Sequence, residues 1–170
     1  FEHDSCGVSF VAHIKGVASH GLVSTGLGAL TNLAPRGATG AEPDTGDGAG
    51  ILIQVPDRFL RAVLHDEQGV DLPPAGAYAV GMAYLPQDDD ERALAEQRIA
   101  DIAVDEGLRV IAWRDVPVTP DLVGQSAREC MPVFRQLFVT SEQGLRGIEL
   151  DRVAFCRRKR AAHEAEVYFP

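Results

Sequence analysis

Apolar residues alternate with small or polar residues at the start of the chain, over residues 6–14. The apolar face of this segment consists of Val8, Phe10 and Ala12. A period of two that is rich in β-branched and aromatic residues predicts a β-strand, and the Lys15-Gly16 pair that follows predicts a turn. Residues 49–55 form a second apolar segment, which is continuous rather than alternating and so predicts a fully buried strand.

The segment between these two strands is expected to hold a helix and then a loop. Ser19 is a suitable N-cap for a helix that ends before Pro35. Its apolar positions are Leu22, Leu27, Leu30 and Leu33. Residues 37–50 are rich in glycine and predict a loop that leads into the second strand.

The rest of the chain predicts further helices and strands. Helices are expected from Pro56-Asp57 through Leu64, from Asp88 to Gly107, near residues 121–128 and over residues 149–165. Strands are expected over residues 78–85, 108–113 and 132–140, with another beginning near residue 167. This order departs from the regular alternation of a Rossmann domain and predicts an α+β fold, although the pattern alone does not give the order of strands in the sheet.

Composition and charge narrow the class of protein. The 170 residues are 45% hydrophobic and 24% charged, as expected for one globular domain. A net charge of −9 argues against nucleic acid as a partner, because phosphate binding needs concentrated positive charge. The one basic run, residues 157–160, is expected to be a solvated helix face. Neither an apolar segment of about 20 residues nor a basic signal sequence is present, so no membrane partner is expected.

Three cysteines are widely separated along the chain: Cys6, Cys130 and Cys156. Their odd number argues against a disulfide framework and favours a reducing compartment, which predicts a cytoplasmic protein. No cysteine or histidine cluster has the spacing of metal ligands, so no metal site is expected in this chain. Cys130 and Cys156 have bulky neighbours and are interpreted as core residues.

Cys6 is the candidate nucleophile, although an isolated cysteine in a strand is more often a small buried apolar residue. Gly7 would let a substrate approach the backbone closely, and Ser5 is small enough for a cleavage site. Removal of residues 1–5 would give Cys6 a free α-amine, whose pKa is about 7.7–8.0 in model peptides. Such an amine can act as general base for the thiol of the same residue.

Arg36 is the candidate cationic residue of the site. It is flanked by Pro35 and Gly37 after the first helix, and this constrained backbone favours a fixed role over that of a surface charge. Gly37, Asp47 and Gly48 are expected to support the substrate loop, with Asp47 bonded to nearby backbone, although a purely structural turn remains the alternative. A phosphate-binding role is disfavoured because the glycines precede a strand rather than a helix.

Three segments carry a resemblance to a known family: HDSCGVSFVA (residues 3–12), NLAPRGATGA (residues 32–41) and DTGDGAGILIQVP (residues 44–56). They resemble the start of the large subunit of bacterial glutamate synthase, its class II glutamine amidotransferase domain of the N-terminal nucleophile type. The resemblance is strong over about the first sixty residues and rests on the order of elements beyond them.

The resemblance implies a four-layer αββα fold in which residues 1–5 are a propeptide remnant and residues 6–170 the N-terminal part of the glutaminase domain. Cys6 would attack the glutamine side-chain amide, form a thioester and release ammonia, with Arg36 supporting that end of the site. In the full-length protein the ammonia would travel to a synthase site that aminates 2-oxoglutarate reductively. FMN and a 3Fe-4S cluster are implied there, and the expected partners are the rest of the large subunit and a small electron-donor subunit.

Two positions depart from the family pattern. Pro35 stands where the family usually has His, and Ser9 where it usually has Gly. The family's oxyanion-hole residues and its ligands for the glutamine α-carboxylate and α-amine are expected beyond Pro170, so the isolated chain is predicted to be a poor glutaminase. The electron donor, NADPH or ferredoxin, is left open. So are two alternatives: another class II amidotransferase or amide hydrolase, and a non-catalytic domain of the same fold.

Overall fold

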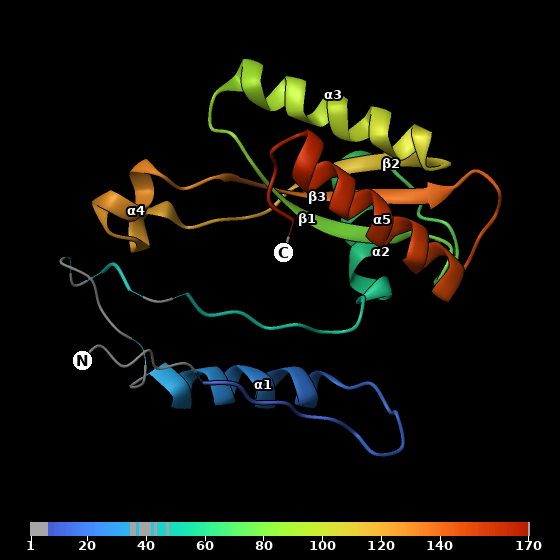
Figure 1. Cartoon of the computed structure of the whole chain (residues 1–170). Helices are drawn as coiled ribbons and strands as arrows, with labels where there is room; N and C mark the ends of the chain where they lie inside the picture. Colours follow the sequence, from blue (N-terminus) through green and yellow to red (C-terminus); the bar gives the residue numbers. More distant parts are fainter. Residues whose placement is uncertain (1–6, 35–36, 38–41, 43, 47, 170) are drawn as a thin grey trace. The chain divides into compact units, whose positions relative to one another are not determined.

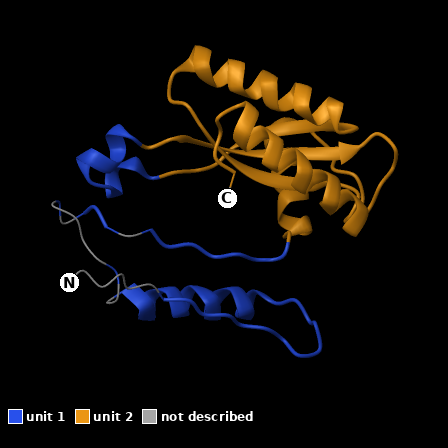
Figure 2. Ribbon diagram, in the orientation of Figure 1, with its two compact units in different colours: residues 1–54, 119–130 blue, residues 55–118, 131–170 orange. Residues whose placement is uncertain are grey.

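The computed structural model describes residues 7–34, 37, 42, 44–46 and 48–169 (Figure 1). The chain divides into two compact units (Figure 2). One unit comprises residues 1–54 and 119–130, and the other comprises residues 55–118 and 131–170. The segment 119–130 therefore belongs with the start of the chain, although it connects two strands of the other unit.

The larger unit is built on a three-stranded antiparallel sheet. Its strands are β1 (Ala79–Leu85), β2 (Leu108–Asp115) and β3 (Val133–Ser141), in the order β1-β3-β2. Gly81 pairs with Leu137 on one side of β3, and Trp113 pairs with Leu137 on the other. The strands predicted at residues 78–85, 108–113 and 132–140 are thus confirmed. Tyr168 adds an isolated antiparallel bridge to Tyr84, at the position where a further strand was expected to begin.

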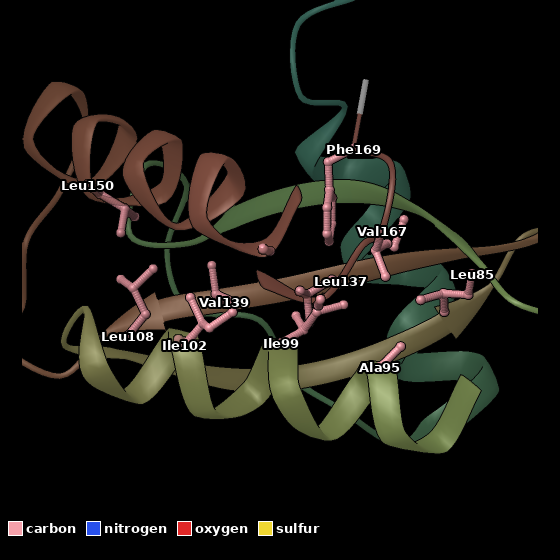
Figure 3. Packing of buried hydrophobic residues seen from close by; sticks show 14 residues of the cluster. Leu85, Ala95, Ile99, Ile102, Leu108, Leu137, Val139, Leu150, Val167 and Phe169 are labelled. Carbon is pink, nitrogen blue, oxygen red and sulfur yellow. The ribbon is translucent and has the colours of Figure 1, made fainter. Parts of the chain in front are cut away.

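Consecutive side chains of β3 face opposite sides of the sheet, as pleating requires. Leu137 and Val139 belong to a core that the sheet shares with α3 (Asp89–Asp105) and α5 (Ile148–Glu164). Figure 3 shows side chains of both helices in this core: Ile99, Ile102 and Leu150. Phe138 faces the other way and packs in a second core with Leu60 and Leu64 of α2 (Asp57–Gln68). Helices therefore cover both faces of this sheet.

The helix ends follow the sequence signals closely. The Asp88 carboxylate caps α3 by accepting hydrogen bonds from the backbone amides of Asp90 and Glu91, both at 3.0 Å. Negative charge in this first turn also suits the helix dipole. Helix α2 ends at Gly69, whose φ of 67° places it in the left-handed region that glycine tolerates. The predicted helices α2, α3 and α5 are confirmed.

A bidentate ion pair fixes α2 to the sheet. The buried Arg114 guanidinium donates to both carboxylate oxygens of Glu67, at 2.9 and 3.0 Å, and a third hydrogen bond at 3.0 Å reaches Gln136. Gln68 donates to the Trp113 carbonyl at 2.9 Å. Bidentate pairing of this kind adds geometric specificity, so it sets the position of α2 along β2.

The raised pKa of the Tyr78 phenol predicts that the protein loses stability at alkaline pH. Its hydroxyl donates to Asp57 at 3.0 Å, and burial, with Asp57 as the second cause, raises the pKa of Tyr78 to about 12. The raised pKa means that the fold favours the protonated phenol. The contribution of Tyr78 to the free energy of unfolding is therefore complete below about pH 10, which is the pKa of tyrosine in the unfolded chain. This contribution is lost as the pH rises through about 12. Urea unfolding followed by Trp113 fluorescence should show this decline in the wild type and a smaller one in Tyr78→Phe. Equal declines would contradict the assignment.

The smaller unit contains α1 (His20–Leu33), a 3-10 turn η2 (Pro120–Leu122) and the short helix α4 (Gln125–Glu129). Helix α1 follows Ser19 and ends before Pro35, as predicted, although the Ser19 side chain makes no cap hydrogen bond. The helical turns at 120–122 and 125–129 lie where one short helix was expected near residues 121–128.

Two predicted strands are wrong as far as the structure describes them. Residues 7–14 and 49–55 form no strand, and within the described parts of the chain no segment pairs with them. Several of their apolar side chains are almost fully exposed: Val8 (90%), Phe10 (91%), Ile14 (103%) and Leu52 (100%). Sequence pattern gives a segment its tendency toward a strand, but a strand also needs a neighbour for its backbone amides and a surface to cover its apolar face.

Three further expectations about side chains are wrong. Cys130 and Cys156 are exposed rather than core residues. Arg157, in the run expected to be solvated, is 4% exposed and lies 5.9 Å from the centre of the Phe169 ring. Its Nε and Nη2 find no hydrogen-bond partner among the described residues, and burial lowers the pKa of Arg157 to about 10. Arg160 follows the expectation, since it is paired with acidic side chains at the surface.

Candidate active site

The predicted site residues divide into two groups. Cys6, Arg36 and Asp47 lie outside the described residues, so their predicted roles remain predictions. Gly7, Gly37 and Gly48 are described, as are helix α1 and the loop residues 42, 44–46, 49 and 50. The site is therefore built from the chain that immediately adjoins Cys6 and Arg36.

Gly7 lies against the end of α1. A Cβ added to Gly7 would be 2.6 Å from Cδ2 of Leu33 and 3.1 Å from Cδ1 and Cγ of the same side chain. No larger residue fits there without moving Leu33, which is the last residue of α1. The residue after Cys6 thus packs on the helix end that leads directly into Pro35-Arg36.

A hydrogen bond joins the residues on either side of Pro35-Arg36. The backbone amide of Gly37 donates to the Ala34 carbonyl at 3.0 Å. Ala34 itself caps α1 through its amide, which donates to the Thr31 carbonyl. The two residues that flank the predicted Arg36 turn are therefore held together at the helix end that Gly7 contacts.

The far side of the glycine-rich loop also returns to α1. A Cβ added to Gly26 would lie 3.0 Å from Cδ1 of Ile51, so the residue after Gly50 contacts the middle of the helix. Gly48, by contrast, has open space around its Cα. Helix α1 thus contacts the segment that begins at Gly7, through Leu33, and the segment that follows Gly50, through Gly26.

Glu42 is a residue of this loop that the sequence pattern did not single out. Its carboxylate accepts hydrogen bonds from the Thr45 hydroxyl at 2.8 Å and the Ser126 hydroxyl at 3.0 Å. The Ser126 backbone amide approaches the same carboxylate at 3.3 Å. These hydrogen bonds, that of Thr45 first, lower the pKa of Glu42 below its usual value. Glu42 and Ser126 are 84 positions apart, so only the fold brings them together.

The described residues include no group of three or more His, Cys, Asp or Glu side chains that could hold a metal ion. None of the helices formed by these described residues is long and apolar enough to cross a membrane. What the described residues show instead is main chain packed on one helix: Gly7 and Ile51 contact α1, and the Glu42 carboxylate binds Thr45 and Ser126.

Comparison with known proteins identifies relatives over almost the whole chain. Residues 6–169 match the family of class II glutamine amidotransferases. The chain is 40% identical over 162 residues to the large chain of NADPH glutamate synthase from Bacillus subtilis, covering 95% of this chain and 10% of that protein. It is 37% identical to ferredoxin-dependent glutamate synthase 2 from Synechocystis, covering 92% of this chain and 10% of that protein.

A eukaryotic relative gives the same result. The NADH glutamate synthase of Schizosaccharomyces pombe is 35% identical over 169 residues, which cover 96% of this chain and 8% of that protein. The chain thus spans about a tenth of the length of these relatives. The match over residues 6–169 and the identities to three glutamate synthases show that the chain belongs to the class II glutamine amidotransferase family.

Proposed function

We propose that this chain is the N-terminal part of the glutaminase domain of a glutamate synthase large chain, with Cys6 as the nucleophile. The observation that carries the proposal is the packing of Gly7 on Leu33, since it brings the residue after Cys6 to the helix end that precedes Arg36. The family match, which begins at residue 6, supports the same assignment. L-glutamine is the proposed substrate, and glutamate and ammonia are the products.

The proposed reaction needs no histidine. The free α-amine of Cys6 accepts the proton of its own thiol, whose reference pKa is about 8.5. The sulfur then forms a bond to the side-chain carboxamide carbon of glutamine, and the carbonyl oxygen takes up the charge. When the oxyanion collapses, the C–N bond of the side chain breaks. The protonated α-amine of Cys6 gives its proton to the leaving nitrogen, which departs as ammonia. A water molecule, deprotonated by the same amine, attacks the thioester and releases glutamate.

Arg36 and the loop residues have supporting roles in this proposal. A guanidinium presents several donors in a fixed planar array, so Arg36 would hold backbone oxygens near the nucleophile and favour its thiolate. Gly37 and Gly48 would allow the two turns to approach the site closely, and Asp47 would fix its turn by accepting backbone amides. The contacts of Gly7 and Gly37 with the end of α1 support this arrangement.

The remaining features of the full-length protein are proposed from the relatives. We infer a four-layer αββα domain in which removal of residues 1–5 exposes the Cys6 amine. Ammonia would then pass to a synthase site with FMN and a 3Fe-4S cluster in other parts of the protein, and a small subunit would supply electrons for glutamate biosynthesis. The Bacillus relative is named for NADPH and the Synechocystis relative for ferredoxin, so both donors remain candidates. The cytoplasm is the proposed compartment.

A glutamine analogue with an electrophilic side-chain carbon tests the nucleophile. Treated with a small excess of the analogue, the full-length protein should acquire one label, on Cys6, and glutamine should protect against it. Cys130 and Cys156 are exposed and serve as internal controls, because a general alkylating reagent should modify both. Glutamine-protected labelling of either of them instead of Cys6 would refute the proposal.

Gly7→Ala should impair the site without unfolding the protein. The new methyl group would overlap Leu33, so either the Leu33 side chain or the backbone next to Cys6 must shift at the end of α1. A displacement of about 1 Å can cost about 100-fold in rate, and we expect a loss of about 10- to 100-fold in glutamine-dependent activity. Gly28→Ala is the matched control, since a Cβ there meets open space. Equal activities of the two variants would contradict the packing described for Gly7.

A further inference from the structure

The glycine-rich loop is fastened to the connection between β2 and β3. We call this attachment the Glu42 clamp and define it by four of its residues: Glu42, Thr45, Gly124 and Ser126. All four belong to the same compact unit, although the last two lie between strands of the other unit in sequence. Besides the hydrogen bonds to the Glu42 carboxylate, the backbone amide of Gly124 donates to the Asp44 carbonyl at 3.1 Å. The attachment therefore uses both side chains and backbone.

The clamp requires a residue without a side chain at position 124. A Cβ at this position would overlap Oγ1 of Thr45 and Oε2 of Glu42, and it would lie 3.3 Å from Cβ of Thr45. The two oxygens are the partners in the 2.8 Å hydrogen bond of the clamp, so relief of the overlap would break that bond. The close approach of loop and connection thus depends on glycine at position 124 as well as on Glu42.

The place of the clamp in the loop gives it a consequence for the site. In the sequence, Glu42 and Thr45 lie between the predicted Arg36-Gly37 and Asp47-Gly48 motifs, so holding these two residues would limit how far the chain on either side of them can move. A carboxylate that accepts several hydrogen bonds is a strong anchor, since bonds to a charged acceptor exceed neutral ones in strength. Among the described residues, Gly37 also contacts the end of α1, and Ile51, just after the loop, contacts the middle of this helix.

We propose that Glu42 is a positioning residue for glutamine hydrolysis, which acts by attaching the glycine-rich loop, at Glu42 and Thr45, to the segment 119–130. In this proposal Glu42 need not touch the substrate or the nucleophile; it would act by setting the position of the chain on either side of it. The inference rests on the proposed function, because its consequence is measured at the Cys6 site. It also makes the β2–β3 connection a second support of that site, far from it in sequence.

The test uses the full-length protein and compares glutamate formation from glutamine with that from added ammonium, which bypasses the Cys6 site. Glu42→Ala should lower glutamine-dependent kcat by about tenfold or more, with ammonium-dependent activity within about twofold of the wild type. Glu42→Gln should retain more activity than Glu42→Ala, because its amide oxygen still accepts from the Ser126 hydroxyl. Gly124→Ala should resemble Glu42→Ala. Adding Ser126→Ala to Glu42→Ala should cost little more, as expected for partners in one interaction.

Asp121→Ala is the matched control for charge, since Asp121 lies on the same connection, is exposed and is 4.0 Å from its nearest cationic partner, Arg128. It should leave both activities unchanged. The proposal is overturned if Glu42→Ala keeps its glutamine-dependent kcat within twofold of the wild type. It is equally overturned if both activities of Glu42→Ala fall together, because that pattern indicates general destabilisation.

Amide hydrogen exchange separates failure of this inference from failure of the proposed function. Glu42→Ala should speed exchange at the Thr45 and Ser126 amides while β3 keeps its protection. Unchanged exchange there would refute the clamp whatever the enzyme does. If Cys6→Ala retains wild-type glutamine-dependent activity while exchange in Glu42→Ala rises as expected, the clamp stands and the proposed function fails.

Discussion

Replacing Cys6 with alanine should reduce glutamine-dependent glutamate formation by the full-length protein on the order of 10⁴-fold, while formation from added ammonium continues. The loss is large because both the covalent step and the hydrolysis of the thioester require the sulfur. Ammonium enters after that chemistry, so its use should stay within about twofold of the wild type. Steady-state assays with each nitrogen source, on the same preparation, measure the two effects together.

Controls for this variant are available in the same chain. Cys130→Ala and Cys156→Ala remove the other two thiols, both exposed, and should leave both activities unchanged. Normal release of ammonia from glutamine by Cys6→Ala would favour a non-catalytic domain of this fold. If a Cys130 or Cys156 variant loses glutamine-dependent activity and Cys6→Ala does not, Cys6 is not the nucleophile.

Phe138→Ala should destabilise the larger unit by about 3–5 kcal/mol, the usual cost of removing a buried aromatic side chain. Phe138 is fully buried in the centre of β3 and is the side chain of that strand that packs against α2. Its removal leaves a cavity beside Leu60 and Leu64. The Arg114–Glu67 ion pair also holds α2 on the sheet, but it cannot fill this apolar cavity.

Urea unfolding followed by the emission of Trp113 measures this loss, since the chain has one tryptophan and it lies in β2. Leu94→Ala on α3 is the control, because Leu94 is 54% exposed and should cost less than about 1 kcal/mol. A midpoint for Phe138→Ala no lower than that of Leu94→Ala would contradict the assignment of Phe138 to the core.

Most of the elements that the sequence predicted well lie in the larger unit, where they pack against one another, and α1 is a correctly predicted helix of the smaller unit. β3 was predicted from its apolar residues at 133–134 and 137–139, and its two faces are covered by α2 and by α3 with α5. The order β1-β3-β2 was not predictable, since pairing joins residues as distant as Ala79 and Val139. Residues 7–14 carry an equally clear pattern but find no strand partner among the described residues, which shows that alternation alone does not make a sheet.

The candidate site was predictable only as far as its motifs extend. Cys6, Gly7, Arg36 and Gly37 could be predicted as candidates because such residues occur together in short segments with a known chemistry. Glu42 was missed, since a single acidic residue in a loop has no pattern and Ser126 is 84 positions away. The burial of Arg157 was missed for a similar reason: its neighbours in sequence are charged, and only the packing of α5 beside Phe169 encloses it.

The most direct test of the account is the first residue of the active protein. Mass spectrometry of the N-terminal peptide from catalytically active full-length enzyme should find Cys6 at position one, carrying an unmodified α-amine. An active enzyme whose chain still starts at Phe1 or upstream of it would leave the sulfur without its proposed base and contradict the mechanism.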